Sequence, residues 1–183
     1  MAITVVPTLA FMADVYRRPA AGGPTSGRFT RYVAAAAERL PVHGYNPMTS
    51  KPVLPTVEAL LAVDAESVLA AAAGRTAARL GHEGDLAMHV TVATPGMWTD
   101  RTGTEVEHRL LGADAGALLW WFDQPVTPAA VEAEAVAQTA RLVAGLRRGG
   151  PPATLADAVE QEGRALALAA ALAHPVLAHE VGA

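Results

Sequence analysis

The sequence predicts an α+β fold in which a small antiparallel sheet packs against four or five helices. Residues 86–94 alternate between apolar and small or polar side chains, as in a half-buried strand, and residues 117–122 form a dense apolar run. Alanine-rich segments with apolar residues at helical spacing stand before and after these runs. The sheet is expected over about residues 86–123. An all-α domain is the alternative, which would require helices in place of the strands after residue 100.

Two regular elements are expected before the first long loop. Residues 3–6 are β-prone, and Pro7 suits the first position of a helix that would end near Arg17. Beyond a loop rich in glycine and proline, apolar spacing predicts a helix over residues 27–40. Residues 41–55 contain four prolines and are expected to be irregular, and long irregular segments often carry function.

Residues 55–80 have the pattern of a long helix that one acidic residue interrupts. Asp64 falls on the apolar stripe to which Leu61 and Val68 belong. A carboxylate at such a position is paired, exposed at a helix break, or part of a site. The preferred interpretation is a break, with Asp64 at the N-cap of a second helical segment.

The strand over residues 86–94 is expected to bury one face and expose the other. Its inner face would hold Leu86, Met88, Val90 and Val92. The segment 104–111 is compatible with a third strand or with a short helix. In the last apolar run, Trp120 and Trp121 must point to opposite faces of a strand. One is expected to pack inward, and the other to lie under a helix, at a subunit interface or in a pocket; the interface would make the protein a homodimer.

The C-terminal third is expected to consist of two helices. The threonine–proline pair at 127–128 is typical of a helix start, and that helix would run to about Arg148. The sequence Gly-Gly-Pro-Pro at 149–152 predicts a sharp break. Thr154 would then cap a last helix that ends near Ala173.

Composition limits the functional classes. A chain of 183 residues, 51% of them hydrophobic, suits a single domain over residues 1–183. The absence of cysteine excludes thiolate chemistry and disulfides. A net charge of −4 without a basic stripe argues against nucleic-acid binding. Without a leader pattern or an 18-residue apolar stretch, we expect no membrane association and a cytoplasmic location. The 41 alanines, and 13 arginines against one lysine, are typical of GC-rich bacterial coding.

Polar chemistry is concentrated between residues 89 and 122. Six ionic or imidazole side chains lie between residues 99 and 111, in a chain of which only 17% is charged. Apolar walls nearby would shift pKa values and favour acid–base work, while arginines suit an anionic ligand. The predicted catalytic residues are His89, Glu105, Glu107 and His108. The predicted substrate-binding residues are Thr91, Trp98, Arg101 and Arg109.

Two short motifs in this region resemble parts of known signatures. His89-Val-Thr91 resembles one half of the signature of the two-histidine phosphoesterases, in which both side chains on one strand face hold a phosphate. That family carries the motif twice, and the other five histidines do not repeat it. Glu105-Val-Glu-His108 resembles the E-x-x-H ligand motif of the ferritin-like di-iron proteins, which need a second copy that is also missing. Neither resemblance assigns a family.

The functional hypothesis follows from these residues. The expected function is that of a small-molecule enzyme of bacterial metabolism with either a His/Glu acid–base site or a mononuclear metal site. Iron or zinc would be the metal. The sequence leaves the reaction type open. A pocket shared by His89 and at least one of Glu105, Glu107 and His108 is expected, with an arginine at its edge. The alternatives are a non-catalytic dimeric ligand-binding or scaffold domain, and a solvated sheet face with cross-strand ion pairs.

Overall fold

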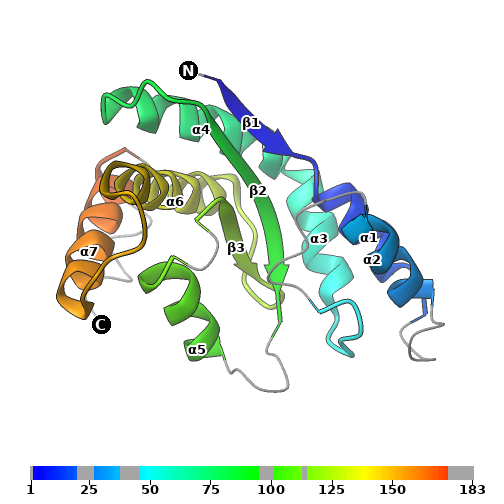
Figure 1. Ribbon diagram of the computed structural model, residues 1–183. Helices are drawn as coiled ribbons and strands as arrows, with labels where there is room; N and C mark the ends of the chain where they lie inside the picture. Colours follow the sequence, from blue (N-terminus) through cyan, green and yellow to red (C-terminus); the bar gives the residue numbers. More distant parts are fainter. Residues whose placement is uncertain (1, 20–26, 38–45, 95–100, 113–114, 173–183) are drawn as a thin grey trace.

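The chain forms a mixed helix–strand fold around a three-stranded parallel sheet. The computed structural model describes residues 2–19, 27–37, 46–94, 101–112 and 115–172. The strands β1 (Ile3–Val6), β2 (Leu86–Ala93) and β3 (Ala117–Trp121) lie side by side in the order β1-β2-β3 (Figure 1). The α+β class predicted from the sequence is confirmed, and strands are present at the two runs predicted to form the sheet, 86–94 and 117–122. The sheet extends beyond the predicted residues 86–123, because the β-prone segment at residues 3–6 forms its edge strand β1.

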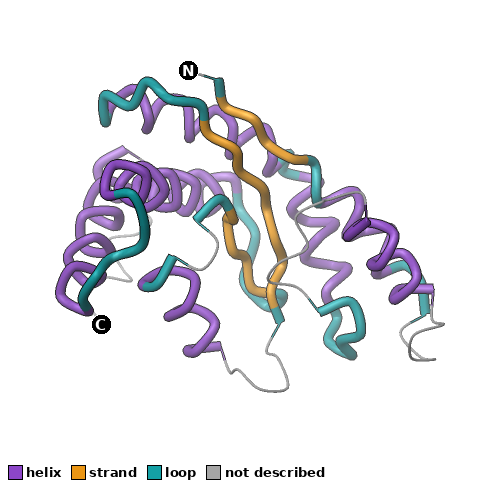
Figure 2. Tube along the Cα trace, viewed as in Figure 1, coloured by secondary structure: helices purple, strands orange, loops and turns teal. Residues whose placement is uncertain are grey.

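Helices make up most of the described chain (Figure 2). Between β1 and β2 lie α1 (Leu9–Tyr16), α2 (Gly27–Ala37), α3 (Val53–Ala62) and α4 (Ala65–Arg79). Between β2 and β3 lie α5 (Arg101–Glu105) and the π-helical turn η2 (Val106–Leu110), and after β3 come α6 (Pro128–Arg148) and α7 (Leu155–Leu172). No helix within the described ranges is both long and apolar enough to cross a membrane.

The predicted antiparallel sheet is wrong, because all strands of the sheet run in one direction. Ile3 pairs with Leu86 on one side of β2, and His89 pairs with Ala117 on the other, both in parallel register. Parallel neighbours need a crossover connection, and each crossover here contains helices. The segment 104–111 is therefore helical, and the third antiparallel strand considered for it does not exist.

The expectation that β2 is half-buried is also wrong. The predicted inner face is buried as expected, but His89, Thr91 and Ala93 on the opposite face are buried too. β2 is the central strand of the sheet, and parallel strands in such positions are covered on both faces. The alternation along β2 therefore separates large side chains from small or polar ones, not buried ones from exposed ones.

Each face of the sheet carries its own cluster of buried side chains. Met88, Val90 and Trp120 belong to the main core with α1, α3, α4 and α6, and α4 and α6 pass behind the strands in Figure 1. Trp121 packs on the other face with Ala93 and Leu119. Both tryptophans are buried within the chain, so the reason for expecting one of them at a subunit interface is gone. The homodimer itself stays a prediction.

Most helix boundaries follow from local signals in the sequence. Asp64 separates α3 from α4 in a left-handed conformation (φ 50°), which confirms the break, although its side chain makes no capping hydrogen bond. Thr127 caps α6 by accepting a hydrogen bond from the Ala130 amide at 3.1 Å. The ends predicted near residues 40 and 173 lie outside the described residues.

Candidate functional site

The π-helical turn η2 brings His108 and Arg109 against the two C-terminal helices. Its wide winding is closed by a hydrogen bond from the Leu111 amide to the Val106 carbonyl at 3.1 Å. η2 packs on α7, which leaves His108 only 4% exposed and Arg109 largely covered. Single π-helical turns occur preferentially at functional sites, so this turn is a natural place to look for a ligand.

A buried arginine of α6 organises the polar side chains beneath η2. Arg141 is 3% exposed and binds both carboxylate oxygens of Glu162 on α7 at 2.8 Å. Its remaining terminal nitrogen contacts Glu134 at 3.0 Å and the side-chain oxygen of Gln138 at 3.1 Å. Burial alone would lower the pKa of Arg141, but the two carboxylates more than offset it and the pKa is raised. Arg141 is therefore a fixed cation that fastens α7 to α6.

Arg109 approaches the same two carboxylates without forming a hydrogen bond to them. Its terminal nitrogens lie 3.6 Å from Glu134 and 3.8 Å from Glu162, beyond hydrogen-bond range. Its Nε is buried and has no hydrogen-bond partner in the described part of the chain. The guanidinium is thus held by charge attraction, and its N–H groups form no hydrogen bond within the described chain.

A cavity of about 430 Å³ opens between η2, α6 and the connection from α6 to α7, within the size range of small-molecule pockets. Three cations line it: Arg109, Arg141 and Arg148. No acidic side chain lines it among the described residues. Its apolar walls are formed by Leu142, Leu146, Pro151 and Pro152. This cavity combines cationic side chains with an apolar surface.

Glycines at the end of α6 shape one wall of the cavity. Gly149 adopts a left-handed conformation (φ 78°), and the Gly150 amide bonds back to the Gly145 carbonyl at 3.0 Å, as in a Schellman motif. The chain then passes Gly112, where an added Cβ would lie in ordinary van der Waals contact with Pro151, at 3.6 Å. Arg148 immediately precedes this turn and donates hydrogen bonds to the Pro151 carbonyl at 3.3 Å and to Gln161 at 2.7 Å.

The structure divides the predicted site residues between three places. His108 and Arg109 line the cavity, whereas His89, Glu105 and Glu107 are not among its lining residues. His89 and Thr91 are buried on β2, and Glu107 is exposed on η2. Trp98 lies outside the described residues.

Glu105 and Arg101 belong to a separate cluster at the end of β3. Glu105 accepts a hydrogen bond from the Trp121 indole at 2.6 Å and another from Arg101 at 3.0 Å. The Arg101 guanidinium stacks 5.1 Å from the centre of the Trp121 ring and lies 3.6 Å from Asp123. The carboxylate of Glu105 therefore has two donors and anchors α5 to the sheet.

Sequence reasoning did not identify Gln138, Arg141 and Arg148 as site residues. Glu134, Gln138 and Arg141 follow one another at spacings of four and three, so they share one face of α6. This polar stripe was the available signal. It resembles an ordinary solvated helix face until the packing of η2 and α7 over it is known.

A metal site and a family assignment both lack support. Within the described residues, no group of three or more histidine, aspartate or glutamate side chains is placed to hold a metal ion. Comparisons with protein-family models, with curated proteins and with solved structures find no match. The functional argument therefore depends on the chemistry of the cavity.

Proposed function

We propose that this protein binds a small organic anion in the cavity between η2, α6 and residues 149–152. The observation that carries the proposal is Arg109, a cation in the cavity wall whose N–H groups donate no hydrogen bond within the described chain. Such donors form strong, charge-assisted bonds to a carboxylate or a phosphate.

The arrangement of charges around Arg109 favours an anion over a neutral ligand. Glu134 and Glu162 together balance the charges of Arg141 and Arg109, whereas Arg148 donates only to neutral oxygens. One cation of the lining therefore has no carboxylate partner within the described chain, and an anion would supply that negative charge. The leucines and prolines of the walls would contact an apolar part of the same molecule, which makes an aromatic or branched carboxylate or phosphate ester the best-suited ligand class.

The enzymatic hypothesis is proposed on the same cavity, with His108 as its acid–base residue. Of the four predicted catalytic residues, His108 is the one that lines the cavity beside Arg109. An imidazole next to a bound anion can exchange a proton near neutral pH. A ligand-binding domain without turnover is the alternative, and it differs by leaving its bound ligand chemically unchanged.

Calorimetric titration with three matched probes tests the anion proposal. Benzoate and phenyl phosphate are expected to bind, and benzamide, which has the shape of benzoate but no charge, is expected to bind at least tenfold more weakly. Replacement Arg109→Gln removes charge-assisted hydrogen bonds of about 1.5–3 kcal/mol, so the affinity for benzoate should fall about 10- to 150-fold. Arg109→Lys, which keeps the charge but not the planar fork, should retain part of the affinity.

The control is Arg17→Gln, because Arg17 also pairs with a glutamate, Glu58, but lies far from the cavity on α1's C-cap. This variant should bind benzoate as the wild type does. Equal affinities for benzoate and benzamide, or unchanged binding in Arg109→Gln, would show that the cavity is not an anion site.

A further inference from the structure

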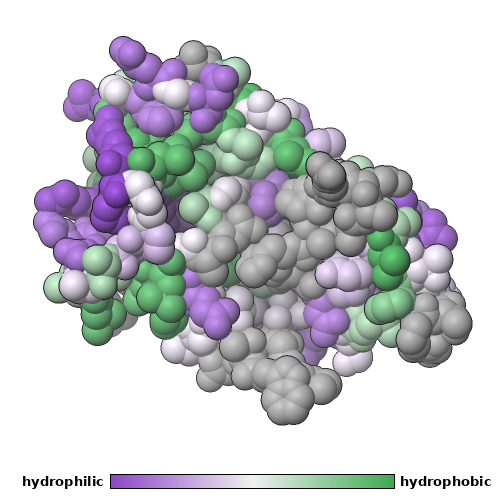
Figure 3. All heavy atoms as spheres, in the orientation of Figure 1, coloured by the Kyte–Doolittle hydropathy of each residue, from purple (hydrophilic) through white to green (hydrophobic). Residues whose placement is uncertain are grey.

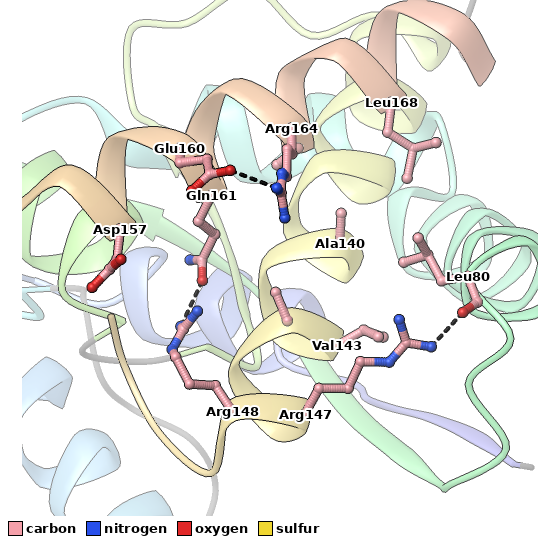
Figure 4. A pocket seen from close by; sticks show the side chains of 12 residues that line it. Leu80, Ala140, Val143, Arg147, Arg148, Asp157, Glu160, Gln161, Arg164 and Leu168 are labelled. Carbon is pink, nitrogen blue, oxygen red and sulfur yellow. Dashed lines mark hydrogen bonds and ion pairs between the residues drawn. The ribbon is translucent and has the colours of Figure 1, made fainter. Parts of the chain in front are cut away.

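A second hollow lies between α6 and α7 (Figure 4), and it shares Arg148 and Gln161 with the lining of the proposed anion site. It has a volume of about 470 Å³. We refer to it as the α6–α7 groove. Its floor is apolar and consists of Leu80, Ala140, Val143, Ala144, Ala165 and Leu168. Small side chains from α6 and α7 thus leave an elongated apolar surface open between the two helices.

Two arginines at the end of α6 border this groove and pair with no carboxylate of the described residues. Arg147 donates to the Leu80 carbonyl at the end of α4, and Arg148 to Gln161 and the Pro151 carbonyl (Figure 4). The C-termini of α4 and α6 each contribute about half a negative charge, which leaves about one positive charge of this pair uncompensated. In Figure 3 strongly hydrophilic residues stand beside hydrophobic ones on the side where α4 and α6 end.

The acidic residues of the rim already have partners. Glu160 forms an ion pair with Arg164 one turn along α7, as the dashed line in Figure 4 shows. Asp157 caps α7 by accepting hydrogen bonds from the amide and the hydroxyl of Thr154 at 3.1 and 2.7 Å. Neither carboxylate contacts Arg147 or Arg148, so the cationic end of the groove is not neutralised from within the described chain.

We propose that the α6–α7 groove binds a linear amphipathic anion, a medium-chain carboxylate, with its head at Arg147 and Arg148 and its chain on the apolar floor. The inference is independent of the proposed function, because Arg147 and the floor residues do not line the other cavity. Arg148 and Gln161 line both, and their 2.7 Å hydrogen bond forms the wall between the two.

A homologous series of carboxylates measures whether the floor holds an alkyl chain. Hexanoate, octanoate and decanoate are titrated below their micelle concentrations, with 1-octanol as the uncharged counterpart of octanoate. A fully covered methylene contributes about 0.8 kcal/mol, a factor of about four, and a half-covered one about a factor of two. Each two-carbon step should therefore raise the affinity between about fourfold and about 15-fold, and octanoate should bind more tightly than 1-octanol.

Two variants locate the chain and the head. Ala144→Leu fills the middle of the floor with a good helix former and should abolish octanoate binding, whereas Ala71→Leu on the exposed side of α4 should leave it unchanged. Arg147→Gln should lower the affinity for octanoate towards that for 1-octanol, with Arg148 retaining part of the difference, whereas Arg79→Gln, in the last turn of α4 and outside the groove, should leave it unchanged. Urea unfolding of each variant shows whether it is folded.

The outcomes separate the two sites. Octanoate binding that survives Ala144→Leu, or affinities that do not rise with chain length, would overturn the groove assignment. If Arg109→Gln loses octanoate binding and Ala144→Leu keeps it, the carboxylate binds in the other cavity. That result would overturn this inference and leave the proposed function intact. Binding lost in Ala144→Leu and kept in Arg109→Gln supports it.

Discussion

Replacement of Arg141 by methionine tests the polar cluster on which the candidate site is built. Arg141→Met keeps most of the side-chain volume but removes the cation that pairs with Glu134 and Glu162. Breaking a buried pair by removing one partner costs about 3–5 kcal/mol, because the remaining charge is left uncompensated. Arg109 stays 3.6 and 3.8 Å from the same carboxylates and offsets part of this cost, so we expect the lower end, about 3 kcal/mol.

Thermal unfolding followed by circular dichroism measures this effect. A domain of this length loses about 2–4 °C per kcal/mol, so Arg141→Met should lower Tm by roughly 6–12 °C.

The matched control for this prediction is Arg75→Met, which removes an arginine–glutamate pair between α4 and α6 whose arginine is 60% exposed. Exposed pairs contribute less than about 1 kcal/mol, so this variant should change Tm by no more than about 4 °C. If Arg141→Met and Arg75→Met have equal, small effects, Arg141 does not hold α7 on α6 as described.

Three further predictions concern other parts of the fold. Burial raises the pKa of Tyr16, although Arg28 opposes the shift, so the stability that the neutral phenol contributes is present below pH ~10 and is lost above it. Between pH 9 and 11 the urea midpoint should therefore fall less steeply with pH in Tyr16→Phe than in the wild type. Equal slopes would refute this. Asp64 has a left-handed backbone conformation, which glycine adopts without the steric strain of a Cβ, and its side chain makes no capping hydrogen bond. Asp64→Gly should therefore be more stable than Asp64→Ala by about 1 kcal/mol in urea unfolding. Equal stabilities of the two variants would show that the backbone is not strained there. Thr154 accepts a hydrogen bond from the Asp157 amide at 3.1 Å, so Thr154→Ala should lower the free energy of unfolding by about 1 kcal/mol. The control is Ser50→Ala, on an exposed loop. If Thr154→Ala loses less stability than this control, Thr154 does not act as a cap.

The sequence predicted where the strands and most helices lie, but not how the strands pair. Caps and breaks are local, so Thr127, Thr154 and Asp64 could be read directly. The direction of pairing is not local. The segment between β2 and β3 has enough polar alternation to resemble a third strand, and its true role as a helical crossover depends on covering the second face of β2.

The candidate site was predicted in part for a similar reason. His108 and Arg109 stood out because charges are dense around them in the sequence, and both line the cavity. Glu105 and Arg101 share that density but turn to Trp121, which is 16 residues from Glu105 and adjacent to it only in the fold. Arg141 was missed because a polar residue on a helix becomes a buried group only when α7 packs over it.

The most direct test of the proposed anion site is a chemical-shift titration of ¹⁵N-labelled protein with phenyl phosphate. Four glycines line the cavity, Gly112, Gly145, Gly149 and Gly150, and their amides report on its occupancy. Gly74 on α4 and Gly81 after it lie outside the cavity and serve as internal references. We predict saturable shifts at the four cavity glycines in the wild type, no shift at the two references, and loss of the shifts in Arg109→Gln. Shifts confined to other parts of the protein, or unchanged in Arg109→Gln, would contradict the proposed function.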